Sequence, residues 1–330
     1  MSGMLHVHCG DSSAGALRRS GVPGDVIVWC DPLMDGPTPA GVSGDEWQRI
    51  RAEYHVSVGN AETVDGNLRW QRQQNEALEA FADYEEVILW FDACLFDQTI
   101  LIRHLDWFSG RDLGGTKLSL ICVGEFPGFS RFKGLGELTP EQLASLLDQR
   151  HEVTRAELDL AVRVWAAYRS PDPTEVEALL ASDTSALPHL ASALTHHLQL
   201  FPFVRNGLNV VEESILRESA RLGPKRAAKL IGEVLARTDL PFLSDTQALG
   251  YAATMASATV PLLEADDPAA LRSPEGREQT VAITETGRDV LDSEADAIAL
   301  NGIDRWLGGV HLVGDAWRWD EDNHTLMRGK

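Results

Sequence analysis

The sequence predicts a mixed α/β fold, with a parallel β-sheet in the first 137 residues and a mainly helical remainder. Two observations support this prediction. Short apolar runs alternate with helical stretches as far as residue 125, which is the pattern of a parallel sheet covered on both faces. From Thr139 onward the hydrophobic spacing becomes helical. A chain of 330 residues is long enough for about two domains.

Four apolar runs are predicted to be strands, and each ends in a polar or glycine-containing turn. They are Leu5–Cys9, Asp25–Cys30, Glu86–Phe91 and Lys117–Val123. The stretches with a helical pattern between and after them are Ala14–Ser20, Ser43–Tyr54, Gly66–Phe81 and Asp97–Phe108. Because crossovers between parallel strands are right-handed, we expect the carboxyl ends of all four strands to meet at one edge of the sheet.

The rest of the chain is predicted to hold a helical connector, residues 138–204, and a C-terminal module, residues 205–330. The connector begins at Thr139-Pro140-Glu141-Gln142, which has capping-box spacing and proline at the first helical position. The module has three helical stretches and two short strands that could pair as a wing. They are Val210–Leu222, Pro224–Arg237, Ser244–Ser257, Pro261–Leu263 and Thr280–Ile283. This order of elements resembles a winged-helix unit.

Composition narrows the classes of partner and location. The formal net charge is −21, from 50 acidic and 29 basic residues, which argues against a chain-wide surface for nucleic acid or anionic membranes. No apolar stretch approaches a membrane span, and the N-terminus has no signal-peptide pattern. The four cysteines lack a C-x2-C pair, so their spacing does not predict a zinc site. We expect a cytoplasmic protein of bacterial type with reduced thiols.

Acidic residues follow the predicted strands, and these positions form the candidate site. Ligands bind at the carboxyl edge of open α/β sheets, and carboxylates gathered there repel each other unless a cation or a proton lies between them. We expect Asp92 and Asp97 to act as acid/base or metal residues, and Asp11 with Asp92 to hold a divalent cation, Mg²⁺ being the candidate. Alternatively, aspartate follows strands simply as a turn and helix-capping residue. The acids at this edge are Asp11, Asp31, Asp35, Asp92, Asp97 and Glu125.

Further residues near this edge are candidates for binding a phosphate. The small-residue turn Gly10-Asp11-Ser12 enters a helix, whose free N–H groups and dipole suit an anion. His8 lies near the end of the first predicted strand and is a candidate catalytic residue, although a buried, hydrogen-bonded histidine is an equal alternative. Asp31 and Gln98 are predicted to contact the ligand, and Arg131 and Lys133 to face its phosphate. For the two basic residues, ordinary surface ion pairs are the alternative.

Three segments carry a resemblance to a known family. They are Leu5–Gly15, Trp29–Pro37 (WCDPLMDGP) and Leu89–Gln98 (LWFDACLFDQ), which resemble the uncharacterised bacterial domain-of-unknown-function family 1835. The ending Leu300–Leu312, followed by Trp317-Arg318-Trp319-Asp320, is similar to the C-terminal module that accompanies this domain. The resemblance spans most of the chain. It implies an architecture but no reaction.

A weaker resemblance is to the gyrase-type Toprim domain. Gly10–Gly15 (GDSSAG), Asp92-Ala93-Cys94 and Arg131–Gln142 (RFKGLGELTPEQ) occur in the order of three Toprim signatures. The resemblance implies a metal-binding sheet edge. Two of the three acids of that edge are replaced, by Cys9 and Cys94, so topoisomerase or nuclease chemistry is in doubt. The N-terminal sheet is thus expected to be Rossmann- or Toprim-like.

Together these features predict that the chain binds a phosphorylated small molecule or nucleotide at the sheet edge, with phosphoryl transfer or hydrolysis as the candidate reaction. The alternative is a non-enzymatic regulator whose C-terminal module contacts a protein or DNA. Residues 205–237 hold seven Lys and Arg against four Glu, but Ser244–Ser257, the natural recognition helix, has neither Lys nor Arg. DNA is therefore the less favoured partner.

Overall fold

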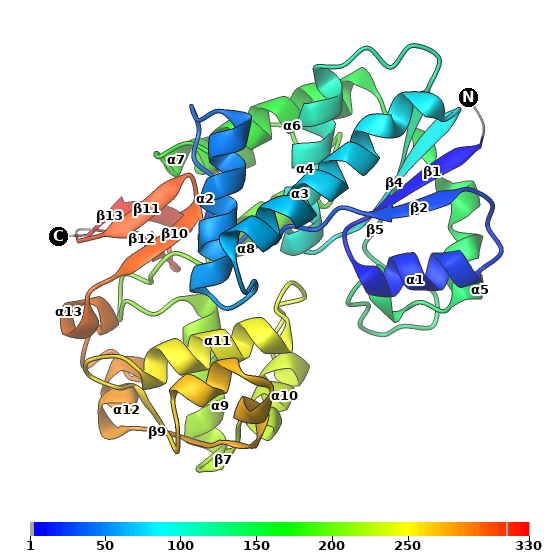
Figure 1. The fold of residues 1–330 in the computed structure, drawn as a ribbon. Coiled ribbons are helices and arrows are strands. Elements are labelled where there is room, and N and C mark those ends of the chain that lie inside the picture. Colours follow the sequence, from blue (N-terminus) through cyan, green and yellow to red (C-terminus); the bar gives the residue numbers. More distant parts are fainter. Residues whose placement is uncertain (1–2, 315, 330) are drawn as a thin grey trace. The chain divides into compact units, whose positions relative to one another are not determined.

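A computed structural model describes residues 3–314 and 316–329 of the chain. The chain divides into two compact units (Figure 1). The first runs from the N-terminus to Thr195 and includes Gly308–Val310; the second comprises His196–Leu307 and His311–Lys330. Most of the predicted connector therefore belongs to the same unit as the sheet.

The first unit contains a five-stranded sheet in the order β2-β1-β4-β5-β6 (Figure 1). Four strands are parallel, which confirms the predicted α/β class: β1 (Met4–His8), β2 (Asp25–Val28), β4 (Glu86–Asp92) and β5 (Lys117–Val123). The fifth, β6 (His151–Glu152), pairs antiparallel with β5 and was not predicted, because a two-residue strand leaves no hydrophobic pattern. The parallel strands bring their carboxyl ends to one edge, as expected.

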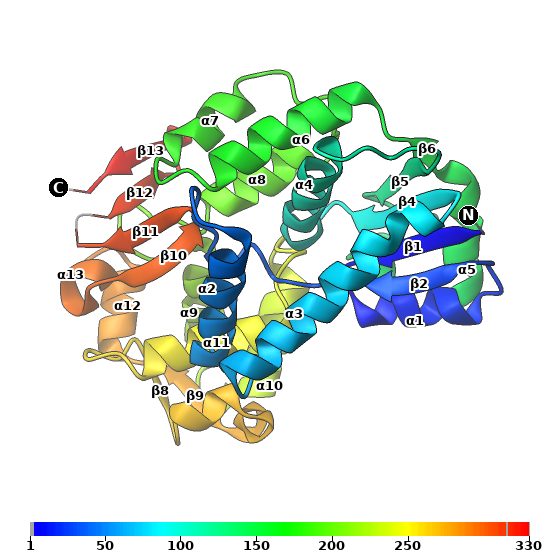
Figure 2. The ribbon, with the colours of Figure 1, turned by 45° about the horizontal axis from the view of Figure 1, so that its top comes forward.

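Helices cover both faces of this sheet. On one face α1 and α5 lie together, and α4 packs on the other with α6 beside it (Figure 2). The helices of this unit are α1 (Asp11–Arg19), α2 (Gly44–Ser57), α3 (Val64–Glu79), α4 (Leu95–Ser109), α5 (Pro140–Ser145), α6 (Arg155–Tyr168) and α7 (Thr174–Leu180), and α8 (Leu190–Leu198) continues into the second unit. Shorter elements are β3 (Gly36–Pro37), η1 (Ala80–Asp83), η2 (Leu135–Glu137) and η3 (Leu147–Gln149).

Alternation along β4 decides which side chains reach which face. Ile88 and Trp90 join a core with Leu17 of α1 and Leu143 of α5, whereas the ring of Phe91 lies 5.8 Å from that of His104 on α4. The whole strand after Glu86 is buried, so its continuous apolar run reflects a central position between two layers of helices. Asp92 has the same parity as Ile88 and Trp90, and it ends the strand.

The C-terminal end of the chain contributes one short segment to the first unit. The amide of Thr38 donates to the carbonyl of Gly308 (2.7 Å), and the amide of Gly309 donates to the carbonyl of Tyr168 (3.0 Å). A Cβ at either glycine would overlap backbone oxygens, of Tyr168 at Gly308 and of Arg169 at Gly309. Only glycine allows so close an approach between the two backbones.

The second unit combines helices with short antiparallel strands. Its three-stranded sheet has the order β7-β9-β8, and Leu263 pairs with Ile283, as predicted for the two wing segments. A separate hairpin joins β12 to β13. The helices are α9 (Val210–Leu222), α10 (Ala227–Arg237), α11 (Asp245–Ala256), η4 (Ala269–Arg272), η5 (Pro274–Glu278), α12 (Glu285–Leu291) and α13 (Ala297–Asn301). The strands are β7 (Lys225–Arg226), β8 (Leu263–Ala265), β9 (Thr280–Ile283), β10 (Asp304–Gly308), β11 (Val310–Val313), β12 (Trp317–Asp320) and β13 (Thr325–Arg328).

Among the described residues, no helix has the length and apolar character that crossing a membrane requires.

Candidate functional site

Asp92 and Asp97 meet at the carboxyl edge of the sheet. Asp92 is the last residue of β4, and Asp97 lies in the first turn of α4, which follows. One oxygen of Asp97, Oδ2, accepts a hydrogen bond from the amide of Asp92 (2.7 Å). Asp92 accepts from two amides, that of Cys94 at Oδ1 (3.0 Å) and that of Leu135 at Oδ2 (3.1 Å). Both side chains are buried, so these contacts replace water.

Thiols surround the two carboxylates. Cys9, at the end of β1, donates its S–H to Asp97 Oδ1 (2.9 Å), and Cys94 Sγ lies 3.9 Å from the same oxygen. The side-chain amide of Gln98 donates to the carbonyl of Asp92 (2.6 Å). Residues Cys9, Asp92, Cys94, Asp97 and Gln98 are called the carboxyl-edge cluster below. It joins two neighbouring strands, β1 and β4, to the start of α4.

Burial makes the charged forms of this cluster unfavourable. It raises the pKa of the Asp92 carboxyl, and burial together with the negative charge of Asp92 raises the pKa of Asp97 well above its usual range. The thiol pKa values of Cys9 and Cys94 are raised for the same two reasons, burial first and the carboxylates second. Across the described residues neither carboxylate forms an ion pair with lysine or arginine. Two acids in one buried place keep a proton, or take a cation, between them.

The glycine-rich loop after β5 closes over Asp92. Gly134 has φ +139°, and a Cβ there would overlap Asp92 Oδ2. Two residues later, a Cβ on Gly136 would lie 3.5 Å from the Cβ of Ser12 in α1. Residues 134–136 therefore run between the carboxylate of Asp92 and the first turn of α1. Two regions that the sequence suggested separately, the small-residue turn and the acidic edge, lie on either side of one short segment.

The start of α1 has open amide groups at the surface. Gly10 caps the helix without a side-chain hydrogen bond, and Asp11 and Ser12 are exposed. Arg131 and Lys133 are also exposed, on the loop that leads to Gly134. These five predicted ligand-binding residues thus lie at the surface on the segments that flank Asp92. The group of ligand atoms that the structure brings together around Asp92 comes from Asp92, Cys94 and Asp97, and the predicted partner Asp11 is not a member of this group.

His8 is buried away from the two carboxylates. Its Nδ1 lies 3.0 Å from the hydroxyl of Ser13, and its ring stacks on Trp90 with centroids 5.3 Å apart. Burial lowers the pKa of His8 to about 3, with the nearby charge of His6 acting in the same direction. The imidazole is therefore neutral at ordinary pH and has the surroundings of a packed core residue. Its other ring nitrogen, Nε2, is buried and has no hydrogen-bond partner among the described residues.

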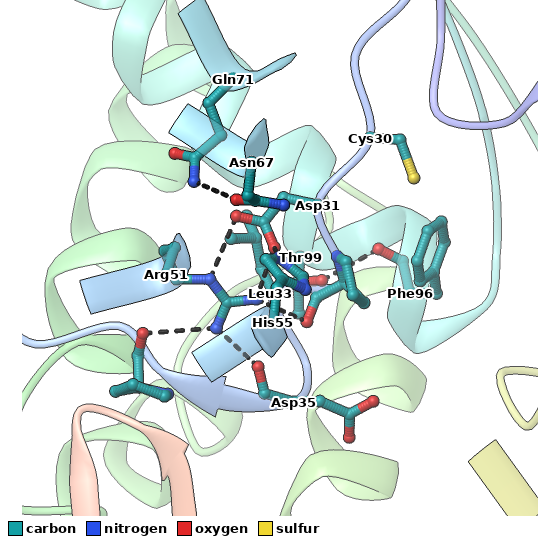
Figure 3. Close-up of polar contacts among 12 residues, drawn as sticks. Cys30, Asp31, Leu33, Asp35, Arg51, His55, Asn67, Gln71, Phe96 and Thr99 are labelled. Atoms are coloured by element: carbon teal, nitrogen blue, oxygen red, sulfur yellow. Dashed lines mark hydrogen bonds and ion pairs between the residues drawn. The ribbon is translucent and has the colours of Figure 1, made fainter. Parts of the chain in front are cut away.

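Asp31 belongs to a different buried network (Figure 3). The Arg51 guanidinium donates to both oxygens of Asp31 and also to the carbonyls of Pro32 (3.1 Å), Asp35 (2.6 Å) and Pro37 (3.3 Å). His55 Nε2 lies 3.0 Å from Asp31 Oδ1. Burial raises the carboxyl pKa, but Arg51 and His55 outweigh it and bring the pKa of Asp31 to about 2.

This network fixes the chain after β2 rather than leaving Asp31 open to a ligand. Arg51 is itself fully buried, and its donors hold the 32–37 segment against α2. The Asp31 found here is therefore a structural ion-pair residue, although sequence alone suggested ligand contact. The other two acids of the predicted edge, Asp35 and Glu125, are not part of the carboxyl-edge cluster.

Three features of the site were not predicted from the sequence. From the sequence, Cys9 and Cys94 were predicted to be ordinary buried thiols, and only the Toprim-like spacing marked their positions. The Leu135 amide contacts Asp92 through the backbone, so no side chain signals it. His189, in the predicted connector, lies against Gly124, where an added Cβ would be 2.7 Å from its Cε1. The electrostatic effect of His189 lowers the pKa of Asp92, and this effect is smaller than that of burial.

No protein-family model matches the chain, and no curated protein matches it either.

Proposed function

We propose that the chain binds a phosphorylated small molecule or a nucleotide at the carboxyl edge of sheet β2-β1-β4-β5-β6, and that it acts on this ligand by phosphoryl transfer or hydrolysis. One observation carries the proposal. Segment 134–136 lies between Asp92 and Ser12, so a ligand seated at the start of α1 would lie a single loop away from the two buried carboxylates.

The phosphate would be held by the start of α1 and the loop before Gly134. A helix N-terminus offers N–H groups and a positive dipole end to an anion. Lys133 and Arg131, on the loop before Gly134, would add positive charge near the phosphate. Gly10 leaves the first amides of α1 without a side-chain cap, which is the condition that this role requires.

The chemistry would come from Asp92 and Asp97. Buried carboxylates in one place either share a proton, and so can act as an acid, or bind a divalent cation that neutralises them. A cation there would stabilise negative charge that develops on a transferring phosphoryl group. Considered without the neighbouring thiols, the two carboxylates suggest Mg²⁺ as this cation.

The Toprim-like resemblance supports this assignment. The three positions that would carry the Toprim acids are Cys9, Asp92 and Cys94, and all belong to the carboxyl-edge cluster. We therefore propose a Toprim- or Rossmann-like sheet of a cytoplasmic, bacterial protein related to domain-of-unknown-function family 1835. Replacement of two acids by thiols argues against nuclease or topoisomerase activity.

Ligand-dependent stabilisation of the full chain tests the proposal. Nucleotides and sugar phosphates are added singly, with and without a divalent cation, and the thermal midpoint is followed. At least one is expected to raise the midpoint of the wild type, because a ligand that binds the folded state stabilises it. Asp92→Asn should lose that shift, and Glu125→Gln, an exposed acid after β5, should keep it. A panel in which no compound stabilises the wild type would refute the proposal.

A second candidate function belongs to the second unit, whose winged-helix-like order of elements suggests a regulator. Its basic residues are already paired with acids, which disfavours DNA. Six of the seven Lys and Arg in residues 205–237 form ion pairs with glutamates: Arg205, Arg217, Arg221, Arg226, Lys229 and Arg237. This pairing favours a protein partner. A salt-sensitive gel shift with duplex DNA, weakened by Arg226→Ala, would instead identify a DNA binder.

A further inference from the structure

Sulfur distinguishes the carboxyl-edge cluster from an ordinary pair of acids. Asp92, Cys94 and Asp97 each offer one ligand atom, and the three atoms lie within 4.8 Å of one another. All three residues are buried. In the described part of the chain, this is the one group of His, Cys, Asp and Glu whose ligand atoms are so close together. The donor set is two oxygens and one sulfur.

We propose that Asp92, Cys94 and Asp97 form a binding site for a thiophilic divalent cation, for which zinc is the chemical match. Thiolate ligands select zinc over magnesium, which prefers oxygen donors and an octahedral shell. The spacing also suits zinc. Zn–S and Zn–O bonds of about 2.3 and 2.0 Å at a tetrahedral angle place sulfur and oxygen about 3.5 Å apart. Cys94 Sγ and Asp97 Oδ1 are 3.9 Å apart.

Gln98 provides a second observation, separate from the three ligand atoms, which indicates that the site takes a further group. Its Nε2 donates to the carbonyl of Asp92 (2.6 Å) and lies 3.3 Å from Cys122 Sγ, so the amide head is held against the cluster. Only 1% of Gln98 is exposed, yet among the described residues its Oε1 has no hydrogen-bond partner. A buried amide oxygen without a donor is costly. A water molecule bound to the metal ion would donate a hydrogen bond to this oxygen.

The same geometry gives Cys9 a positioning role. Its S–H holds Asp97 Oδ1 at 2.9 Å and so orients the carboxylate toward Cys94. Three protein ligands leave one position of a tetrahedral zinc open, which is the arrangement of catalytic rather than structural sites. In the proposed function, a phosphate oxygen of the ligand would occupy the open position, so this step rests on that function. Binding of the metal itself does not require that function.

Metal titrations of the full chain, without nucleotide, test the proposal directly. The protein is first treated with a chelator and dialysed, and then Zn²⁺ and Mg²⁺ are titrated separately by calorimetry. We expect one Zn²⁺ per chain, bound at least about 100-fold more tightly than Mg²⁺. Co²⁺ in place of Zn²⁺ should produce a thiolate-to-cobalt charge-transfer band in the near ultraviolet. No saturable zinc binding, or a cobalt spectrum without that band, would overturn the proposal.

Two cysteine variants make the test specific. Cys94→Ser should abolish the cobalt band and weaken Zn²⁺ binding, whereas Cys30→Ser, whose thiol lies outside the cluster, should change neither. Cys9→Ala should weaken binding by about 10–100-fold and keep the band, as expected for a residue that only orients a ligand. Equal losses in Cys94→Ser and Cys30→Ser would overturn the assignment. If Cys94→Ser fails to fold, the cobalt spectrum of the wild type decides alone.

The results separate this proposal from the function. Zinc binding without stabilisation by any phosphorylated compound would support the metal site and refute the proposed function. Stabilisation by a nucleotide, in a protein that binds no zinc, would support the proposed function and refute the metal site.

Discussion

Removing Arg51 tests whether the Asp31–Arg51 pair holds the chain after β2. In Arg51→Met, the Asp31 carboxylate keeps only its contact with His55, and the carbonyls of Pro32, Asp35 and Pro37 each lose the hydrogen bond that Arg51 donates. Breaking a fully buried ion pair by removing one partner costs about 3–5 kcal/mol. We expect a loss of this size in the free energy of unfolding, measured by urea titration with circular dichroism. Arg49→Met, an exposed arginine of the same helix, should stay within about 0.5 kcal/mol of the wild type.

The double variant isolates the interaction itself. Asp31→Leu should also be costly, because it leaves the guanidinium uncompensated, but Arg51→Met with Asp31→Leu removes both charges together. The double variant should therefore be more stable than the two single losses predict, by at least about 2 kcal/mol. Hydrogen exchange of the amides in residues 33–38 provides a local measure, since this segment should open faster in both single variants. If the stability losses of the two single variants summed to the loss of the double variant within about 0.5 kcal/mol, the two residues would not interact and the reasoning would be refuted.

Two further predictions concern acid stability and the glycine loop. The pKa of Asp31 is lowered from 3.8 to about 2 in the folded chain, so its contribution of about 2 kcal/mol is present above about pH 4 and is lost as the pH falls to about 2. Urea midpoints measured across this range should fall less in Asp31→Leu than in the wild type; parallel curves would contradict this. Gly134→Ala should lower stability by more than about 1 kcal/mol and weaken Zn²⁺ binding, because its φ is positive and its Cβ would displace Asp92. Gly136→Ala is the matched control. If calorimetry showed that both variants weaken Zn²⁺ binding equally, this would contradict the close approach of Gly134 to Asp92.

The sequence predicted the parallel sheet because four buried strands leave continuous apolar runs. It predicted Asp92 and Asp97 as site residues because both follow a strand that ends at the ligand-binding edge of such a sheet. These inferences depend on local pattern and topology, which are properties of a segment of about ten residues. The antiparallel strand β6 is only two residues long and pairs with β5, which lies far from it in the sequence, so no local pattern marks it.

The errors in the predicted site arise from partners far away in sequence. Asp31 has the same local context as Asp92, a carboxylate at the end of a buried strand. The difference between them is Arg51, which lies twenty residues after Asp31 on a helix. Arg51 pairs with the carboxylate of Asp31, and among the described residues the carboxylate of Asp92 has no such cation. The roles of Cys9 and His189 likewise depend on contacts across the sheet. Local sequence therefore predicts where acids gather but not which of them is already paired.

The return of Gly308–Val310 to the first unit has a consequence for how this protein can be dissected. A chain ended at Thr195 would keep every strand of the main sheet and helices α1 to α7, yet the amide of Thr38 and the carbonyl of Tyr168 would each lose a backbone partner. Each unit is compact in space, but neither is continuous along the chain. Limited proteolysis near residue 195 should therefore leave fragments that stay associated, and an N-terminal fragment made alone needs residues 308–310 supplied as a peptide or joined by a linker.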